Sequence, residues 1–213
     1  MARHKISAEH SGTARRILAA AERHFAAQGM AGARTEEIAM AARANKAMLY
    51  YYFGDKRRLH RAVLENLFRQ LRTGVYAPAE RSTQSPRQRL IEFVTSYFDF
   101  LASHPNYPRL VQREAMEATK DFEGIVRNHL RPSHKRLVRM LQEGVRTGAF
   151  RNIDTHQTAF TIMGMTTSYF AAAPILSQVA GHDLMAPKAL LARKRSLLDF
   201  LNHGLLRSKA RSR

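Results

Sequence analysis

Apolar residues recur every three or four positions along most of the chain, which is the spacing of amphipathic helices. In the first third, the pattern predicts a helix from Thr13 to a stop at Gly29, with Phe25 as its last large apolar residue. Another helix follows Asp55, with an apolar residue at every fourth position: Leu59, Val63, Leu67 and Leu71.

Further helices are predicted after a connection over residues 73–85 that is rich in glycine, proline and polar residues. Ser85 and Gln88 are suited to form a capping box at the start of a helix that we expect to continue to Ser103. We expect the remaining helices over 106–118, over 122–147 with an interruption at Pro132, over 155–174 with a possible extension to 181, and over 187–206.

The stretch from Arg34 to Lys56 predicts two short helices joined by a tight turn at residues 43–45. Thr35 suits the N-cap of the first helix, because its hydroxyl can accept a hydrogen bond from a free backbone N–H. The second helix has two unlike faces: Leu49, Tyr52 and Phe53 on one, and Ala47, Tyr50 and Tyr51 on the other.

These two faces match the needs of a DNA recognition helix, which requires one apolar side for packing and one side that enters a major groove. Ala47 would allow a close approach to base edges, and Lys56 and Arg57 would reach flanking phosphates. An ordinary amphipathic helical hairpin fits the same spacing.

The charge of the chain favours a polyanionic partner. The formal net charge is +18, and residues 1–72 hold 14 Lys/Arg against 6 Asp/Glu. The tail over residues 207–213 adds four more positive charges, so the positive density is highest at the two ends. DNA is the partner that fits both this charge and the predicted hairpin.

Several classes of protein are disfavoured. The chain has no cysteine, which excludes disulfides, thiol nucleophiles and thiolate metal sites. His129 and His134, five residues apart, would not share a helix face as metal ligands do, and phosphate-binding glycine loops and catalytic motifs are absent. No apolar run is long enough for a membrane span, and the start lacks the apolar segment of a secretory signal. We expect a cytoplasmic protein that is not an enzyme and needs no metal or cofactor.

The stretch from Thr13 to Leu71 carries a specific set of motifs: ILAAAERHFAAQG, TEEIAMAA, LYYYFGDK and LHRAV. Together they closely resemble the DNA-binding domain of TetR-type transcriptional repressors. The resemblance implies an all-α, dimeric protein that a ligand releases from double-stranded DNA. It implies a helix-turn-helix domain over residues 13–54 and a linker helix with a ligand-binding and dimerisation domain over 55–206. Residues 1–12 are polar and basic without an apolar period, which predicts a flexible basic arm, and residues 207–213 form a basic tail.

The resemblance also assigns candidate DNA contacts. Three residues match positions that commonly touch phosphates: Thr35, Tyr50 and Lys56. Five match the surface around the groove: Arg34, Asn45, Lys46, Ala47 and Tyr51. Arg43 departs from the family, which commonly has glycine in this turn. Arginine there would carry backbone strain or require a slightly different turn, although its charge could contribute to DNA binding.

In such repressors the second half binds a small effector and dimerises through its last two long helices. For the effector, a hydrophobic or aromatic molecule, we expect a lining drawn from Phe93, Tyr97, Phe100, Leu110, Met116, Phe122, Met163, Tyr169 and Phe170, although many of these residues would be plain core. Possible polar contacts, which could equally be surface groups, are Arg113, Glu114, Glu117 and His129. Intramolecular packing is the alternative to dimerisation for the leucine-rich last helix.

The sequence therefore predicts a sequence-specific, DNA-binding transcriptional regulator, acting as a homodimer and released by a small effector. One alternative is a sequence-tolerant DNA-coating protein without an effector. An enzyme or carrier that retains a helical head is a third hypothesis, which the missing catalytic residues disfavour.

Overall fold

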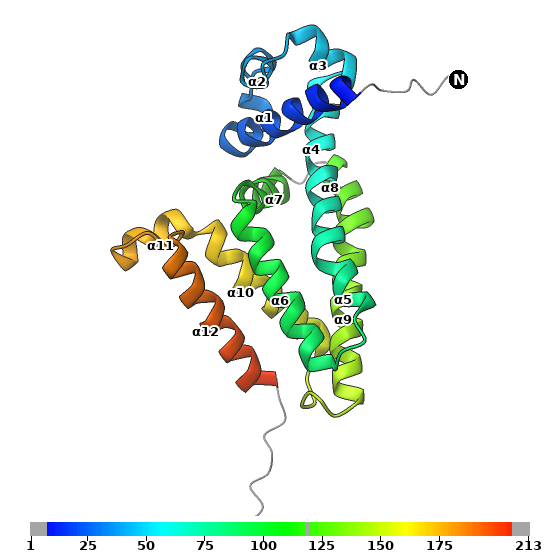
Figure 1. The fold of residues 1–213 in the computed structure, drawn as a ribbon, viewed down its shortest axis with the longest axis vertical. Helices are drawn as coiled ribbons and strands as arrows, with labels where there is room; N and C mark the ends of the chain where they lie inside the picture. Colours follow the sequence, from blue (N-terminus) through cyan, green and yellow to red (C-terminus); the bar gives the residue numbers. More distant parts are fainter. Residues whose placement is uncertain (1–7, 118–119, 206–213) are drawn as a thin grey trace, which may run out of the picture. The chain divides into compact units, whose positions relative to one another are not determined.

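The computed structural model of the protein describes residues 8–117 and 120–205, and every regular element in these two ranges is a helix (Figure 1). The described residues divide into two compact units. The first, here called the head, comprises the residues up to Phe68 together with Arg109–Ile125, and the second, the body, comprises Arg69–Pro108 and the residues from Val126 onward. The border between them falls inside α4 (Lys56–Leu71), inside α7 (Asn106–Glu117) and between α8 (Lys120–Ile125) and η2 (Val126–Leu130).

The head is built from α1 (Ala8–Gly32), α2 (Thr35–Ala41), α3 (Lys46–Phe53), most of α4 (Lys56–Leu71), the end of α7 (Asn106–Glu117) and α8 (Lys120–Ile125). Its core consists of fully buried apolar side chains, one or more from each of the first four helices: Ile17, Phe25, Ile38, Leu49, Leu59 and Leu64. Burial of this kind stabilises the short helices α2 and α3, which are too short to be stable alone.

A buried polar pair joins α4 to the end of α7 within the head. His60 Nε2 lies 3.1 Å from Glu114 Oε1, and both side chains are almost completely buried. The ring of Phe25 meets the His60 imidazole edge-on at a centroid distance of 4.8 Å. Next to Glu114, the Arg113 side chain crosses Gly29, which bends α1 at a φ of 72°. The end of α7 is therefore part of the head core.

The body contains η1 (Arg72–Tyr76), α5 (Ala77–Arg81), α6 (Pro86–Ser103), η2 (Val126–Leu130), α9 (Arg131–Arg146), α10 (Thr155–Ala171), α11 (Ala173–Ala180) and α12 (Pro187–Leu205). Helix α6 is central, since α9, α10 and α12 all pack against it. Its aromatic side chains form the core: Phe93 stacks on Tyr97, and the Tyr97 hydroxyl lies 2.7 Å from Thr167 Oγ1. Burial raises the pKa of Tyr97 to about 12.

The end of α9 is closed by a tight return of the chain. The Phe150 N–H donates to the Gly144 carbonyl at 2.9 Å, and the buried Phe150 ring lies directly over the Gly144 Cα, in the place that a side chain would occupy. The Arg151 N–H then donates to the Leu205 carbonyl at 3.0 Å, which fastens the last turn of α12.

The helices α10, α11 and α12 leave large apolar side chains exposed: Phe160, Ile175, Leu176, Val179, Leu191 and Phe200. The leucine pattern of α12 is divided, because Leu197, Leu201 and Leu205 are buried within the body. No single helix in the described ranges is long and apolar enough to cross a membrane. Only α10 and α11 taken together, with a bend of 73° between them, reach the required length and composition.

The structure corrects several predicted elements. Helix α1 begins at Ala8, so residues 8–12 of the expected arm are helical, while residues 1–7 and 207–213 lie outside the described residues. Most of the connection expected over 73–85 is helical as η1 and α5, because Val75, Tyr76 and Ala79 are buried. The head also extends beyond residue 54, into α4 and α7.

Candidate DNA-contacting surface

Helix α3 presents the two faces that the sequence predicts. Leu49 is fully buried and holds the helix on the head core. On the other side, Ala47, Tyr50 and Tyr51 are exposed, with 66% of the Tyr51 surface accessible. The Asn45 side chain accepts a hydrogen bond from the Met48 N–H at 2.8 Å, which caps the helix and fixes its first turn.

The turn between α2 and α3 contains the expected strain. Arg43 has a φ of 50°, and no other residue except glycine has a positive φ in the described ranges. The turn is held by backbone hydrogen bonds from Arg43 N to Met40 O and from Ala44 N to Ala39 O, at 3.0 and 2.9 Å. The Arg16 guanidinium adds a bond to the Ala42 carbonyl at 3.1 Å. These contacts impose the conformation on a residue that does not favour it.

Two substitutions at Arg43 separate its backbone effect from its charge. Arg43→Gly is expected to raise the free energy of unfolding by about 1 kcal/mol, because glycine adopts a positive φ without strain. Arg43→Ala removes the same charge and keeps the strain, so its stability should stay within about 0.5 kcal/mol of the native protein. Urea unfolding compares the two variants, and equal stabilities would show that the turn is unstrained.

Lys46, at the start of α3, forms an ion pair with Glu36 of α2. The hydrogen bond from the Lys46 ammonium lowers the pKa of Glu36 to about 2, so this carboxylate is ionised at any ordinary pH. Both side chains are exposed. A phosphate that approaches Lys46 therefore meets an ammonium that already has a carboxylate partner.

Glu36→Gln is expected to strengthen binding to random-sequence duplex DNA and to make it more dependent on salt. Removing the carboxylate frees Lys46 for one further phosphate contact, which should steepen the salt slope by about 0.9. Glu65→Gln is the matched control, because it removes an equal charge from the Arg61–Glu65 pair on α4. If the salt slope changes equally in both variants, the effect comes from net charge and not from Lys46.

The nine candidate DNA contacts do not all lie on the exposed surface. Seven are exposed: Arg34, Arg43, Asn45, Lys46, Ala47, Tyr50 and Tyr51. Lys56 is partly buried, and its ammonium donates to the Ala31 carbonyl at 3.0 Å. Thr35 is buried, and the expected N-cap role is wrong, since Arg34 occupies that position and Thr35 is the first helical residue.

One exposed residue beside the turn was not predicted. Met40 of α2 has 75% of its surface accessible. The sequence contained a signal for this exposure. Ile38 and Ala42 mark the buried side of this helix, and a residue midway between them in sequence, such as Met40, lies on the opposite side.

The nine candidate effector residues are not gathered into one set. Six lie in the body, around its aromatic core: Phe93, Tyr97, Phe100, Met163, Tyr169 and Phe170. Leu110 and Phe122 are buried in the head, and Met116 is 80% exposed, so Met116 lines no enclosed cavity within the described chain. Of the possible polar contacts, Glu114 is instead buried against His60.

Comparison with known families gives matches along most of the chain. A family described as bacterial regulatory proteins, tetR family, matches residues 17–63. A second family model, described as tetracyclin repressor-like, C-terminal domain, matches residues 86–201.

Two curated relatives share about half of the chain. The HTH-type transcriptional repressor NicS of Pseudomonas putida is 34% identical over 98 residues, which are 46% of each chain. The HTH-type transcriptional repressor SCO4008 of Streptomyces coelicolor is 36% identical over 105 residues, or 49% of this chain and 50% of that protein. The chain thus spans about half the length of these curated relatives.

The same fold occurs in a solved structure, that of the putative transcriptional regulator SCO4942 from Streptomyces coelicolor. It superposes with a TM-score of 0.72 at 24% sequence identity and covers 92% of this chain and 99% of that one.

Proposed function

The chain belongs to the tetR family of bacterial regulatory proteins, and on that premise we propose that it is a transcriptional repressor that a small molecule releases from its DNA operator. The observation that best supports this proposal is the geometry of α3. This helix is anchored by Leu49 and capped by Asn45, and it presents Ala47, Tyr50 and Tyr51 to the outside. An α-helix with short and polar side chains on its free face fits the major groove.

The proposed working form is a homodimer. One head covers only half of a palindromic site, and the exposed apolar side chains of α10, α11 and α12 offer a surface for a second copy. Two heads would then occupy successive major grooves, which lie about 34 to 36 Å apart on one side of the duplex. Such a dimer would act in the cytoplasm, where bacterial DNA is found.

Release requires a ligand that binds more tightly to the form of the dimer that does not fit the operator. Five buried aromatic residues of the body and the partly buried Met163 remain the candidates for contacting a hydrophobic or aromatic effector: Phe93, Tyr97, Phe100, Met163, Tyr169 and Phe170. No enzymatic step is needed for this cycle.

Selection from a pool of random-sequence duplexes tests the proposal and identifies the operator in the same experiment. We expect enrichment of a palindrome whose half-sites are centred about 10 base pairs apart. Tyr50→Ala should weaken binding to the enriched duplex about tenfold, because a contact with a phosphate beside the groove is lost. Met116→Ala, which truncates another exposed side chain of the head, should leave affinity unchanged.

The rival function, sequence-tolerant coating of DNA, predicts a different result. In that case no sequence would be enriched, and random duplexes would compete as well as any selected one. If a palindrome is recovered but the Tyr50→Ala protein binds it as tightly as the native protein does, α3 is not the helix that recognises the operator.

A further inference from the structure

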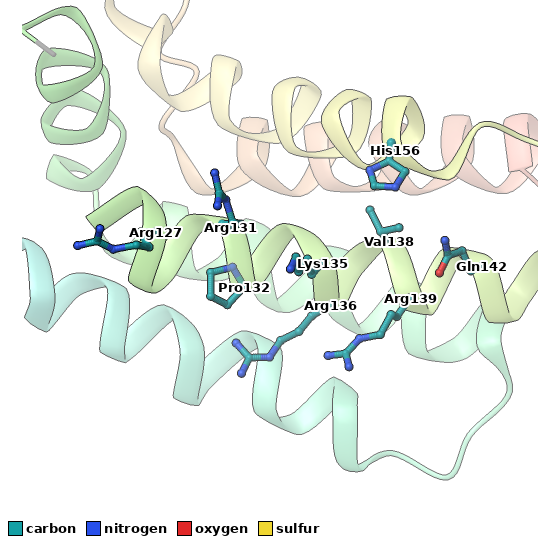
Figure 2. Close-up of a pocket in the computed structure, with 9 residues that line it drawn as sticks. All are labelled: Arg127, Arg131, Pro132, Lys135, Arg136, Val138, Arg139, Gln142 and His156. Atoms are coloured by element: carbon teal, nitrogen blue, oxygen red, sulfur yellow. The ribbon is translucent and has the colours of Figure 1, made fainter. Parts of the chain in front are cut away.

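A basic groove lies along α9 in the body and is lined by residues of η2, α9 and α10. Its volume is about 490 Å³, which is within the usual range for small-molecule sites. Six of its lining residues carry cationic or imidazole side chains: Arg127, Arg131, Lys135, Arg136, Arg139 and His156. Figure 2 shows Arg131 and Val138 directed toward the helix that carries His156, and Arg136 and Arg139 directed to the opposite side.

Four of these cations repeat at every fourth position, namely 127, 131, 135 and 139. At a rise of 1.5 Å per residue they form a row about 18 Å long. Like charges four residues apart destabilise a helix, so the row works against the stability of η2 and α9. Bound anions would relieve this repulsion.

The protein supplies little negative charge to the groove. Glu80 of α5 is shared by two of the cations, at 2.8 Å from Arg136 Nε and 3.7 Å from Arg139 Nη2. No carboxylate within the described ranges pairs with Arg127, Arg131 or Lys135, and all three are exposed. The Arg127 end of the row therefore holds three cations available to a ligand.

We propose that this groove binds a small, multiply charged phosphate ester. Arginine side chains donate paired hydrogen bonds that match the oxygens of phosphate. The apolar surfaces of Pro132 and Val138 and the His156 ring, all part of the lining, suit the organic part of such an ester. A small ligand fits better than duplex DNA, because the groove has a volume of about 490 Å³ and its lining includes Pro132, Val138 and His156 as well as the cations.

Calorimetric titration of the full chain with ATP and with inorganic tripolyphosphate tests the proposal, with adenosine as the uncharged probe. We expect saturable binding of both anions, one per chain, and none of adenosine. The double variant R131Q/K135Q should bind them about tenfold more weakly or worse, since two charge-assisted contacts are lost. Tighter binding of ATP than of tripolyphosphate would indicate that the organic part of the ester contacts the apolar lining of Pro132, Val138 and the His156 ring.

The control variant R87Q/R195Q removes the same charge from exposed positions on α6 and α12, and should lower the affinity less than about twofold. Thermal unfolding separates a binding defect from a folding defect. Without anion, R131Q/K135Q should melt no lower than the native protein, because repulsion is relieved, and added ATP should raise the midpoint of the native protein only.

Three results would overturn the proposal. The anions could fail to bind saturably, or the two double variants could lose the same amount of affinity for ATP. The third is an adventitious ion only, in which a simple salt of equal ionic strength gives the same signal as ATP. A random duplex that displaces ATP, and that R131Q/K135Q binds at least tenfold more weakly, would make the groove a DNA contact instead. None of these outcomes depends on whether an operator is found.

Discussion

Glu114→Ala is expected to lower the free energy of unfolding by about 3 kcal/mol or more. The substitution leaves the buried His60 imidazole without the carboxylate that lies 3.1 Å away, in a part of the head core where both side chains are almost completely buried. It also opens a space beside His60, on which the Phe25 ring packs. Urea unfolding followed by circular dichroism measures the change.

Glu117→Ala is the matched control, because the same side chain is exposed three residues further along α7 and should cost less than about 0.5 kcal/mol. The double variant His60→Leu/Glu114→Leu should recover much of the loss, since two apolar side chains of similar volume can replace a buried polar pair. Equal costs for the Glu114 and Glu117 variants would mean that the buried pair contributes nothing to the head.

Gly144→Ala is expected to lower the free energy of unfolding by about 3 kcal/mol. A Cβ at this position would lie 2.0 Å from Cδ2 of Phe150, far inside contact distance. The Phe150 ring cannot move aside easily, because it is buried and the backbone N–H of Phe150 is hydrogen-bonded to the Gly144 carbonyl. The clash should therefore open the return that follows α9. Thermal and urea unfolding report the loss.

The same substitution at Gly74 controls for the effect of alanine itself, because this exposed glycine has no atom within 4 Å of the added carbon. Gly74→Ala should be neutral or stabilising by up to about 1 kcal/mol. Adding Phe150→Leu to Gly144→Ala should restore part of the loss, since the smaller side chain leaves room. A Gly144 variant as stable as the Gly74 variant would contradict the packing described here.

Features that depend on neighbours in sequence were predictable. The capping box of Ser85 and Gln88 is present at the start of α6, because its groups lie within one helical turn of each other. The strain at Arg43 followed from the family resemblance, since glycine is common in this turn, and the structure gives Arg43 a φ of 50°. The two faces of α3 followed from the helical period and match the observed exposure.

Features that depend on tertiary packing were not predictable. Glu114 reads as a surface group or effector contact, and only the approach of α4 shows that it is buried against His60. Likewise, the row of cations at 127, 131, 135 and 139 is visible in the sequence, but the groove becomes apparent only when α10 brings His156 beside it. The helical pattern in the sequence thus predicts which side chains share a face of a helix, whereas the packing of the helices determines which other side chains they contact.

In the proposed homodimer, the apolar surface of α10, α11 and α12 would link the stability of this protein to its abundance. If two copies pair through that surface, folding and association become one equilibrium, and each tenfold dilution destabilises the pair by about 1.4 kcal/mol. Scarce copies would then leave Phe160, Val179 and Phe200 uncovered and open to nonspecific association. In a cell that makes too little of the protein, part of it would unfold and fewer operators would be bound. Repression would therefore fall more steeply with protein concentration than it would for a stable monomer.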